Sequence, residues 1–488
     1  MYIVQIASEC APVAKVGGLG DVVQGLSHEL AIRGNSVELI LPKYDCMRYD
    51  RIWELQMVYD GLMVPYHDQQ VHCSVFFGFV DGLKCFFIEP HSHKNFFNRG
   101  IYYGHNDDVE RFAFFSRAAM EFLLKAGKHP DIIHCHDWQT GLVPVLLYEM
   151  YQRMGMTHPR VCYTLHNLGH QGLTGEQVLR QVGLDPGALM NRERLQDDSR
   201  PGAVNLMKGG CVYANFITTV SPKYAWEIQN SDCGNGLQHT LHVHGGKFGG
   251  VLNGIDYNVW NPEIDPFIPS QYSAATLDDK YKNKEALRNR FLLRHDYKPI
   301  IAVVSRLDPQ KGVGLIKHAI HYALANGCQF VLLGSSPDHA INNDFWQLKH
   351  QLNDNPDCHL EISYSEELAH LIYAGSDMIL IPSAFEPCGL TQMIAMKYGT
   401  VPVVRKVGGL ADTVFDVDYA DKPYEERNGY LFTDFNNQGV ESALHRAIGF
   451  WYSYPEYFRQ VMENAMRYDF SWNRPGQHYL DIYSYIKE

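Results

Sequence analysis

Short apolar runs typical of buried strands alternate with longer amphipathic segments through the first half of the chain. Such alternation predicts a mostly parallel sheet covered by helices on both faces, the α/β fold called doubly wound or Rossmann-like. The strand-like runs lie at residues 2–7, 36–41, 71–79, 83–89, 132–136, 160–165, 216–220 and 250–253. Helical patterns lie between several of them, at residues 21–33, 108–126 and 141–154.

The alternation stops at a polar stretch, residues 258–273, which contains three prolines, and then starts again. A stretch of this kind is typical of a domain boundary, and a chain of 488 residues is long enough for two or three domains. We therefore predict two doubly wound α/β domains, the first over residues 1–257. The second has a helical pattern at 313–326 and strand-like runs at 300–304, 329–333, 359–362, 378–381 and 401–404.

The formal net charge of −13 limits the partners that suit this chain. Nucleic acids favour basic surfaces, so the charge argues against a DNA or RNA partner. A neutral polymer remains suitable, because its affinity does not depend on long-range charge. An anionic small ligand would need a locally positive pocket.

The cysteine pattern and the apolar runs indicate whether the protein is suited to a reducing compartment and to a membrane. The 11 cysteines include no C-x-x-C pair, and their odd number is unlike a secreted disulfide framework, so we expect a reducing compartment. No apolar run approaches the roughly 20 residues that span a bilayer, so we expect no membrane partner. Residues 1–7 already have the pattern of a buried strand, and we expect no signal or transit peptide.

A glycine-rich turn follows the first strand-like run. Gly17 and Gly18 let the backbone approach a ligand, and the free amides of the following helix can bind phosphate beside Lys15. A turn of this kind is structural about as often as it is functional, and the G-x-G-x-x-G spacing of dinucleotide enzymes is absent. The motif from Lys15 to Asp21 recurs at residues 406–412, again after a strand. Either both halves descend from one unit, or both direct a glycine turn at the same ligand cleft.

Two cations follow the strand-like run at 300–304. Arg306 and Lys311 lie where a parallel strand ends, which is the edge at which open α/β sheets bind ligands. A diphosphate is the ligand that suits them, since arginine can bind it through two parallel hydrogen bonds. The alternative is a solvated turn.

A carboxylate follows the strand-like run at 378–381. Glu386 precedes a proline and Gly389, so we expect it in a fixed turn, from which it can accept hydrogen bonds from sugar hydroxyls. The residues after Gly389 begin a helical pattern, and their amides can bind phosphate. The alternative for Glu386 is a surface charge.

Polar side chains also end two strands of the first half. Asp137 follows the run at 132–136 and His166 follows the run at 160–165, and we place both in the ligand cleft. Of His134 and His136, we expect one to point into the core.

Several pairs of residues have the spacing of metal ligands, but none has a convincing third ligand, so we expect no metal and no cofactor. A diphosphate held by lysine, arginine and backbone amides does not require a metal. The pairs are His91 with His93, His134 with His136, His242 with His244, and Asp416 with Asp418.

Taken together, these motifs resemble those of the bacterial glycogen synthases and plant starch synthases, glycosyltransferase family five. The resemblance runs over essentially the whole chain, and so many motifs in the same order make it highly specific. It rests on residues 15–21, 136–138, 166–167, 219–222, 253–256, 260–262, 305–307, 311–312, 386–392 and 408–413.

The resemblance implies the architecture called GT-B, two Rossmann-like domains with the active site in the cleft between them. The domains would be residues 1–257 on the acceptor side and 258–460 for the nucleotide sugar, with a helical segment, 461–488, that crosses back to the first domain. Family members transfer glucose, usually from ADP-glucose, to an α-1,4-glucan with retention at the anomeric carbon and without a metal. The expected localisation is the bacterial cytoplasm, or the plastid stroma for a mature plant-type protein.

The resemblance also assigns catalytic roles. Arg306 and Lys311 would bind the diphosphate and stabilise its growing charge, at a few kcal/mol for each group. Glu386 would hold the glucose, and Asp137 and His166 would line the sugar site.

Further residues would bind substrate. Tyr364 matches the position that stacks on adenine, the glycines at 17 and 18 would approach the diphosphate, and the threonine at 391 would bond it. The full set is Lys15, Gly17, Gly18, Asp21, Asn253, Tyr364, Cys388, Gly389, Leu390 and Thr391.

Two positions depart from the patterns of related enzymes. Val16 stands where many members carry threonine, which puts the acceptor preference in doubt. Position 394 is isoleucine, so the second glutamate of other retaining transferases is missing, as it usually is in starch synthases. The alternatives are a sucrose-phosphate or trehalose-phosphate synthase and a glucan-binding scaffold without activity. The residues do not distinguish ADP from UDP in the donor and do not fix the oligomeric state.

Overall fold

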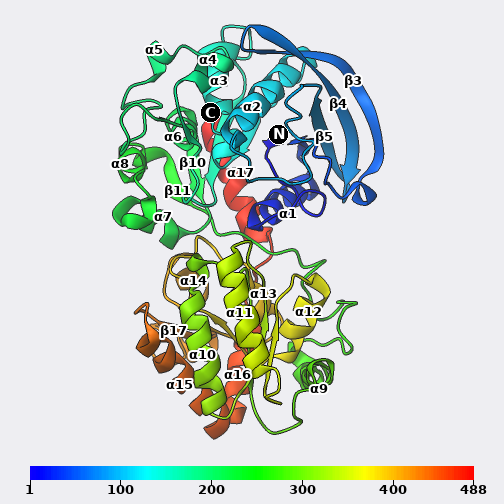
Figure 1. Cartoon of the computed structure of the whole chain (residues 1–488), viewed down its shortest axis with the longest axis vertical. Helices are drawn as coiled ribbons and strands as arrows, with labels where there is room; N and C mark the ends of the chain where they lie inside the picture. The colour runs from blue at the N-terminus through cyan, green and yellow to red at the C-terminus, as the bar shows by residue number, and fades with distance from the viewer. The chain divides into compact units, whose positions relative to one another are not determined.

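The computed structural model describes residues 1–488 and divides into two compact units (Figure 1). The N-terminal unit comprises Met1–Gly254 and Trp472–Glu488, and the C-terminal unit comprises Ile255–Ser471. The division falls near the expected position 257/258, but the last segment returns at Trp472 rather than at residue 461. The reason is local: the amide of Ile255 donates to the carbonyl of Phe470, so the two ends of the C-terminal unit pair with each other.

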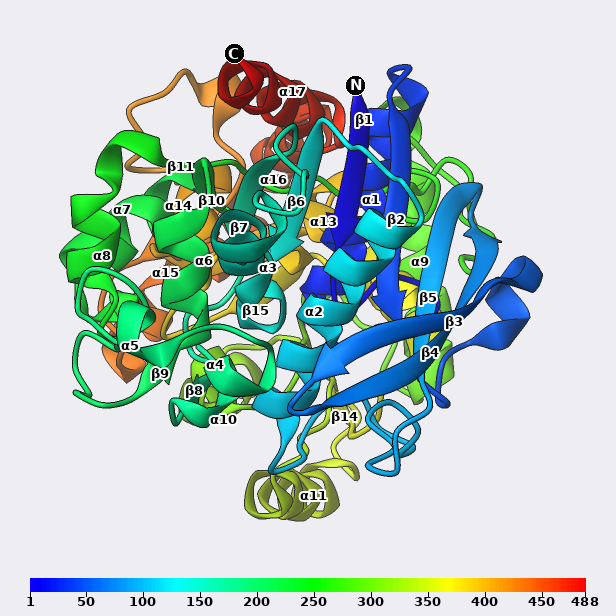
Figure 2. The ribbon, with the colours of Figure 1, turned by 90° about the horizontal axis from the view of Figure 1, so that it is seen from above.

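The N-terminal unit contains a nine-stranded sheet in the order β11-β10-β7-β6-β1-β2-β5-β4-β3. Neighbouring strands are parallel from β11 to β5, and β4 and β3 add an antiparallel ribbon at one edge (Figure 2). The strands are β1 (Tyr2–Ile6), β2 (Ser36–Pro42), β3 (Trp53–Tyr66), β4 (Gln69–Val80), β5 (Leu83–Pro90), β6 (Ile132–His136), β7 (Arg160–Leu165), β10 (Phe216–Thr219) and β11 (Phe248–Gly250), with a separate pair, β8 (Leu173–Thr174) and β9 (Val204–Asn205).

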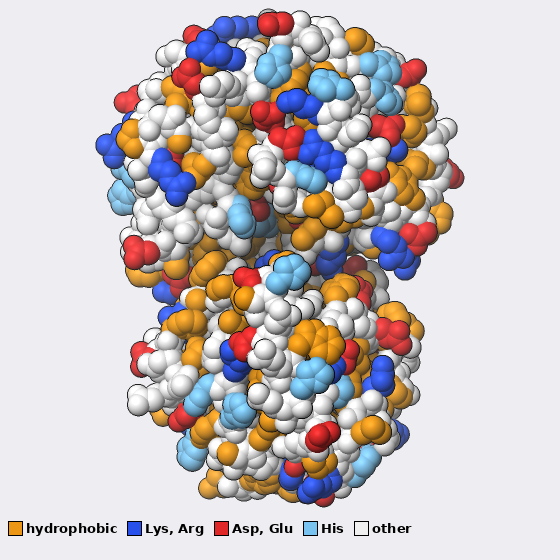
Figure 3. Space-filling view, in the orientation of Figure 1, with side chains coloured by type: hydrophobic (Ala, Val, Ile, Leu, Met, Phe, Trp, Pro, Cys, Tyr) orange, Lys and Arg blue, Asp and Glu red, His pale blue; other side chains and the backbone are white.

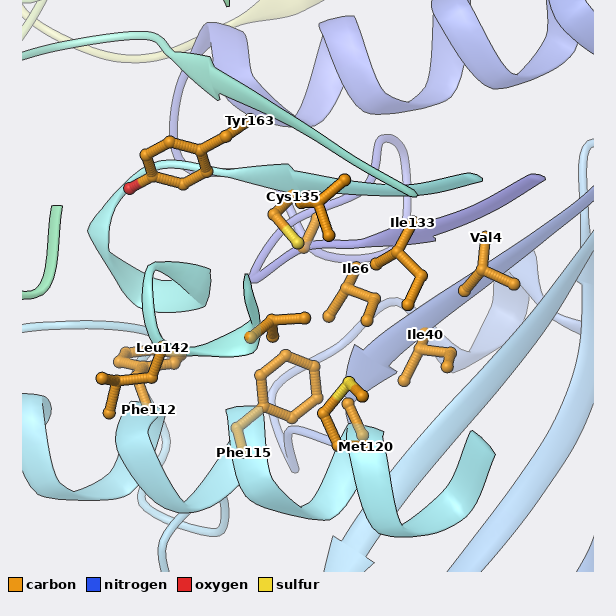
Figure 4. Close-up of a cluster of buried hydrophobic side chains, with 14 of the residues drawn as sticks. Val4, Ile6, Ile40, Phe112, Phe115, Met120, Ile133, Cys135, Leu142 and Tyr163 are labelled. Carbon is orange, nitrogen blue, oxygen red and sulfur yellow. The ribbon is translucent and has the colours of Figure 1, made fainter. Parts of the chain in front are cut away.

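Helices cover both faces of this sheet. On one face α2 buries Phe112, Phe115 and Met120 against Ile133 and its neighbours on the strands, as Figure 4 shows. Burying one such side chain contributes about 1.5–3 kcal/mol. The helices of this unit are α1 (Gly18–Ile32), α2 (Asp108–Lys125), α3 (Leu142–Leu146), α4 (Gln177–Gln181), α5 (Pro186–Leu189), α6 (Leu206–Tyr213), α7 (Pro222–Asn230), α8 (Gln238–Val243) and α17 (Asn473–Lys487).

The C-terminal unit contains a six-stranded parallel sheet in the order β14-β13-β12-β15-β16-β17. Its strands are β12 (Ile300–Val304), β13 (Gln329–Leu333), β14 (Cys358–Glu361), β15 (Met378–Ile381), β16 (Val401–Arg405) and β17 (Tyr430–Phe432). Its helices are α9 (Lys280–Phe291), α10 (Val313–Ala325), α11 (His339–Leu352), α12 (Glu366–Gly375), α13 (Thr391–Lys397), α14 (Gly408–Thr413), α15 (Asn437–Ser453) and α16 (Pro455–Arg467).

Both sheets confirm the predicted doubly wound fold, and each reverses its strand order once. The N-terminal chain runs outward from β1 through β2 and then returns to add β6 on the other side of β1. The C-terminal chain runs from β12 through β13 and returns to add β15 beside β12. Ligands of open α/β sheets bind at the carboxyl ends of the strands at such a reversal.

Some predicted elements differ from the structure. The ribbon strand β3 was missed, because most of its side chains are exposed and it lacks a buried strand's apolar pattern. The helix predicted at 141–154 is shorter, since α3 ends at Leu146 and continues as a π-helical turn, Leu147–Tyr151. The strand predicted at 250–253 lies at Phe248–Gly250.

Acidic and basic side chains are interspersed on the face of each unit shown in Figure 3, without a large patch of one sign. All eleven cysteines are free. No helix combines the length and the apolar character needed to cross a membrane.

The contact between α1 and the start of α17 gives a test of the N-terminal unit's packing. A methyl group added at Gly25 of α1 would overlap the indole of Trp472. We expect Gly25→Ala to destabilise the unit by about 1–3 kcal/mol, because the ring must move. Gly449→Ala on α15 is the matched control, since nothing lies within 4 Å of its added methyl group and alanine favours the helix. Denaturant unfolding measures both, and an unchanged Gly25→Ala stability would contradict this packing.

Candidate active site

The strand reversal of the N-terminal unit brings the glycine turn and Asp137 to the same edge. The turn at residues 15–18 follows β1, Asp137 follows β6 directly, and these strands are neighbours in the parallel sheet. His166 follows the next strand, β7. The residues singled out in this half of the sequence therefore lie together because of the strand order.

The glycine turn is held from below by a buried glutamate that sequence reasoning missed. The Glu9 carboxylate accepts hydrogen bonds from the amides of Val16 (2.8 Å) and Gly17 (3.1 Å) and from the Tyr103 hydroxyl (2.7 Å). Burial raises the pKa of Glu9 above its ordinary value, and the charge of Asp21 adds to this. Two of the turn's amides thus point at Glu9 and are not directed at a ligand.

The outer side of the turn is open. A methyl group added at Gly17 would have nothing within 4 Å, so this glycine leaves space that the fold itself does not fill. Lys15 forms an ion pair with Asp21 at 2.8 Å, with both side chains about one-third exposed. The signal for Glu9 was available in the sequence: it is the one carboxylate between β1 and the glycine turn.

Asp137 has a strained backbone, with φ of 54°, in a region that residues other than glycine rarely adopt. Its Oδ1 accepts a hydrogen bond from the amide of His166 at 2.7 Å. Burial raises the pKa of its carboxyl to about 7, and the charge of Glu9 contributes. A strained, buried carboxylate with a raised pKa is typical of a functional site.

A chain of hydrogen bonds runs from the core to His166. Gln5 Oε1 lies 2.7 Å from His136 Nε2, and His136 Nδ1 lies 3.0 Å from His166 Nε2. Burial lowers the pKa of His166 to about 3, so its imidazole is neutral at physiological pH. A neutral ring can donate or accept a hydrogen bond, but it does not bring a positive charge to the site.

We expected one of His134 and His136 to point into the core, and the structure buries both. Both are fully buried, because residues two apart on a strand face the same side. Their rings lie 4.2 Å apart between centroids. His134 is bonded to Tyr483 of α17 at 2.7 Å and to Thr164 of β7 at 2.6 Å, so it ties the C-terminal helix to the sheet.

Asn253 lies just beyond β11 at the end of the N-terminal unit. It is buried, and its Oδ1 has no hydrogen-bond partner in the protein. A buried carbonyl oxygen without a partner costs free energy, so the position favours a ligand that donates a hydrogen bond.

In the C-terminal unit the strand reversal brings Lys311 and Glu386 into direct contact. Lys311 ends the turn after β12, Glu386 lies in the turn after β15, and Lys311 Nζ is 2.6 Å from Glu386 Oε2. Ser383, which sequence reasoning missed, donates to the same oxygen at 2.9 Å. Lys311 and Ser383 both bond Oε2, so Oε1 remains for a ligand. Glu386 is therefore a fixed, buried carboxylate, and the surface-charge alternative is excluded.

These residues line a small pocket at the carboxyl ends of β12 and β15. Its volume is about 60 Å³, enough for one or two water-sized groups, so it would hold only part of a ligand in this conformation. Its lining includes five of the predicted site residues, namely Lys311, Glu386, Gly389, Leu390 and Thr391, together with Ser383.

Three predicted residues of this half do not line the pocket. The Arg306 side chain is more than half exposed and lies 3.5 Å from Asp308. Tyr364 is 77% exposed. Cys388 is buried beneath the turn.

The second copy of the glycine motif has a packing role that the first copy lacks. Methyl groups added at Gly408 and Gly409 would overlap the carbonyl oxygens of Glu386 and Cys388, and the Gly409 amide donates to the Glu386 carbonyl at 3.1 Å. These glycines let α14 pack directly on the turn that carries Glu386. Gly17 has no such neighbour, so the two copies differ in what they contact.

Two of the pairs with metal-like spacing have other partners. His134 and His136 belong to the buried hydrogen-bond chain, and Asp416 and Asp418 both accept from Arg446. No group of three or more His, Cys, Asp or Glu side chains is arranged to hold a metal ion.

The raised pKa of Asp137 gives a test of its environment. The folded carboxyl holds its proton up to about pH 7, whereas the ordinary pKa is 3.8, so the stability of the folded state falls as pH rises through this window. Asp137→Asn keeps the oxygen that accepts from His166 and does not titrate. We expect the variant to gain stability relative to the wild type between about pH 5 and pH 8, by at least about 1.4 kcal/mol, the value of one pKa unit. A stability difference that does not vary with pH, measured by denaturant unfolding, would contradict the assignment.

Comparisons with known proteins agree with this architecture. Residues 2–243 match the family model described as starch synthase catalytic domain, and residues 284–465 match that of glycosyl transferases group 1. Glycogen synthase 1 of Nitrosococcus oceani is 69% identical over 488 residues, with both chains fully covered. Glycogen synthase 2 of Methylococcus capsulatus is 66% identical over 99% of each chain.

Solved structures give the same result. The catalytic domain of starch synthase IV from Arabidopsis thaliana, bound to ADP and acarbose, matches with a TM-score of 0.97 and 45% identity, covering 100% of this chain and 99% of that one. A sucrose-phosphate synthase from Thermosynechococcus elongatus matches with a TM-score of 0.63 and 18% identity, which shows a shared fold alone. With two Rossmann-like units of the GT-B type and full-length relatives of high identity, this chain is a glycosyltransferase that belongs to the glycogen synthase and starch synthase family.

Proposed function

We propose that this enzyme transfers glucose from ADP-glucose to the non-reducing end of an α-1,4-glucan, with retention at the anomeric carbon. The observation that carries the proposal is the Lys311–Glu386 pair at the strand reversal of the C-terminal unit. It puts a cation suited to a diphosphate beside a carboxylate suited to sugar hydroxyls. The names of the relatives support glucan elongation, and the ADP in the starch synthase IV structure supports an adenine nucleotide as the donor.

In the proposed reaction, Lys311 binds the diphosphate of the donor. As the glycosidic bond breaks, negative charge grows on the phosphate oxygens, and a positioned cation stabilises it by a few kcal/mol. Arg306 would add a second cation by turning from Asp308 toward the phosphate, which its exposure permits. Gly389, Leu390 and Thr391 supply the pocket wall, and the exposed ring of Tyr364 would stack on the adenine.

Glu386 would hold the glucose. Its Oε2 is engaged by Lys311 and Ser383, which fixes the carboxylate, and its Oε1 can accept from a sugar hydroxyl. In the N-terminal unit, the neutral ring of His166, the carboxyl of Asp137 and the unpartnered oxygen of Asn253 would bind hydroxyls of the transferred ring.

The glycine turn would complete this set. Gly17 and Gly18 would allow close approach of the donor, because the outer side of the turn is open. Lys15 and Asp21 would shape the site through their ion pair. Because Glu9 occupies two of the turn's amides, we assign the turn a steric role, and the charge stabilisation falls to Lys311 and Arg306.

Retention is proposed to occur by attack on the same face from which the nucleotide leaves. The bond from the anomeric carbon to the phosphate oxygen breaks, the acceptor 4-hydroxyl oxygen bonds to that carbon, and its proton passes to the departing phosphate. The products are ADP and a glucan longer by one glucosyl unit. Glu386 is engaged by two donors, which argues against its acting as a nucleophile. A trapped glucosyl-enzyme would contradict this route.

No cofactor or metal is proposed. Lysine and arginine supply the positive charge that a diphosphate needs, so the chemistry does not require a metal. No nucleic-acid or membrane partner is proposed either, in keeping with the net charge of −13.

The test is transfer of labelled glucose onto a maltooligosaccharide, with ADP-glucose and UDP-glucose supplied separately and EDTA present. We expect chain extension from ADP-glucose, and a fall in kcat/KM of about 10²–10³ in Lys311→Ala and in Glu386→Ala. Tyr485→Ala, which changes an exposed tyrosine beside Phe216 at the amino end of β10, is the control and should keep full activity.

Other products would overturn the proposal. A phosphorylated disaccharide made with a sugar-phosphate acceptor would indicate a sucrose-phosphate or trehalose-phosphate synthase. Loss of activity with EDTA that added metal restores would contradict the metal-free site.

A further inference from the structure

Four aromatic side chains of the C-terminal unit surround an open groove of about 350 Å³ that the reaction does not use. They are Tyr424, Phe450, Tyr454 and Tyr457, and we call this feature the tyrosine groove. Tyr454 and Tyr457 are 57% and 58% exposed. Single exposed aromatic residues are ordinary, but a hollow lined by four of them marks a binding surface.

The tyrosine groove lies at the edge of the sheet opposite to the Lys311–Glu386 pocket. Phe450 is near the end of α15 and Tyr454 precedes α16, two helices that pack together at the lower end of this unit in Figure 1. Trp451 packs against Tyr297, which lies just before β12 begins. The end of α15 is therefore at the amino ends of the strands, whereas the pocket is at their carboxyl ends.

The groove is pre-formed. The turn that carries Tyr424 is fixed to α16, because the Asn464 amide donates to the carbonyls of Tyr424 (2.9 Å) and Arg427 (3.0 Å). Arg427 in turn donates to the carbonyls of Lys422 and Val417, both at 2.9 Å. A ligand would therefore meet a wall that needs no ordering on binding, which favours affinity.

The charges beside the groove select against a charged partner. Lys422 and Glu426 pair with each other at 2.8 Å, and the Arg427 guanidinium is bonded to backbone carbonyls. The cations at this surface are thus engaged, and the protein carries a net charge of −13, which disfavours a polyanion. Four aromatic residues are also far fewer than the roughly 20–30 residues a side of a stable dimer interface.

The chemistry of the lining favours a sugar polymer. Pyranose rings present polarised C–H groups, which suit the negative face of an aromatic ring, while their hydroxyls suit the hydroxyl tips of tyrosines. The Tyr454 and Tyr457 rings are 6.4 Å apart and 72° to each other, so they form a corner in which a curved chain can lie.

We propose that the tyrosine groove is a second binding site for α-1,4-glucan, separate from the site of transfer. The identity of the polymer rests on the proposed function, whereas a neutral sugar chain as the ligand class rests on the groove itself. Attachment at a second point raises the local concentration of chain ends around the enzyme. The groove therefore increases affinity for long, branched glucan and leaves the reaction with short acceptors unchanged.

The test uses the full chain and the double variant Tyr454→Ala/Tyr457→Ala. Native gels containing glycogen, run without donor, measure binding as retardation of the protein. We expect the variant's dissociation constant for glycogen to rise about tenfold, the change expected when two stacking contacts are lost. The KM for glycogen should rise in parallel, while kcat and KM with maltotriose stay at wild-type values. Tyr485→Ala, a 65% exposed tyrosine on α17, is the matched control and should be retarded like the wild type.

Three results would overturn the proposal. In the first, glycogen does not retard the wild-type protein. In the second, glycogen retards the double variant as strongly as the wild type. In the third, the double variant loses monomer–dimer association but still binds glycogen. Unfolding curves of the variant establish that it is folded. Failure of the proposed function is seen separately, because wild-type protein would then not extend maltotriose from ADP-glucose, whatever the gels show.

Discussion

The ion pair between Lys311 and Glu386 is the interaction on which the C-terminal site depends. It exists because β12 and β15 are neighbours although 73 residues lie between them, and because two turns approach each other closely. Added methyl groups at Gly312 and Gly409 would strike the carbonyls of Pro382 and Cys388, so only glycine permits this approach. These two glycines thus shape the protein backbone that holds the charges.

In the N-terminal unit, buried carboxylates hold the backbone of the site segments in place. Glu9 accepts a hydrogen bond from the glycine turn, and Asp137 accepts one from the backbone amide of His166. Both have pKa values raised by burial, and the charge of Glu9 adds to the rise in the pKa of Asp137. Placing two carboxylates this way costs stability, which the packing of the core must offset, including the cluster between α2 and the strands (Figure 4). A site with fixed, partly neutralised acids suits the binding of sugar hydroxyls.

Much of this was predictable from the sequence. Periodicity predicted the fold class and most strand positions, because buried parallel strands are continuous apolar runs with clear ends. It also placed Lys311, Glu386, Asp137 and His166 at strand ends. The pairing of lysine with glutamate was not predictable, since it depends on strand order, and Ser383 gave no signal because an isolated serine in a turn is common. That both His134 and His136 point into the core was missed, although strand alternation alone contained the answer.

The central claim is that Lys311 exchanges part of its contact with Glu386 for the donor's diphosphate. Calorimetric binding of ADP to the wild type, Lys311→Met and Glu386→Gln measures this directly, with unfolding curves as a check on folding. The account predicts that Lys311→Met weakens ADP binding at least about tenfold, as the loss of a charge-assisted bond requires. Glu386→Gln should bind ADP as tightly as the wild type or more tightly, because ADP has no glucose and the lysine is released. Wild-type affinity in Lys311→Met, or a large loss in Glu386→Gln, would contradict the account.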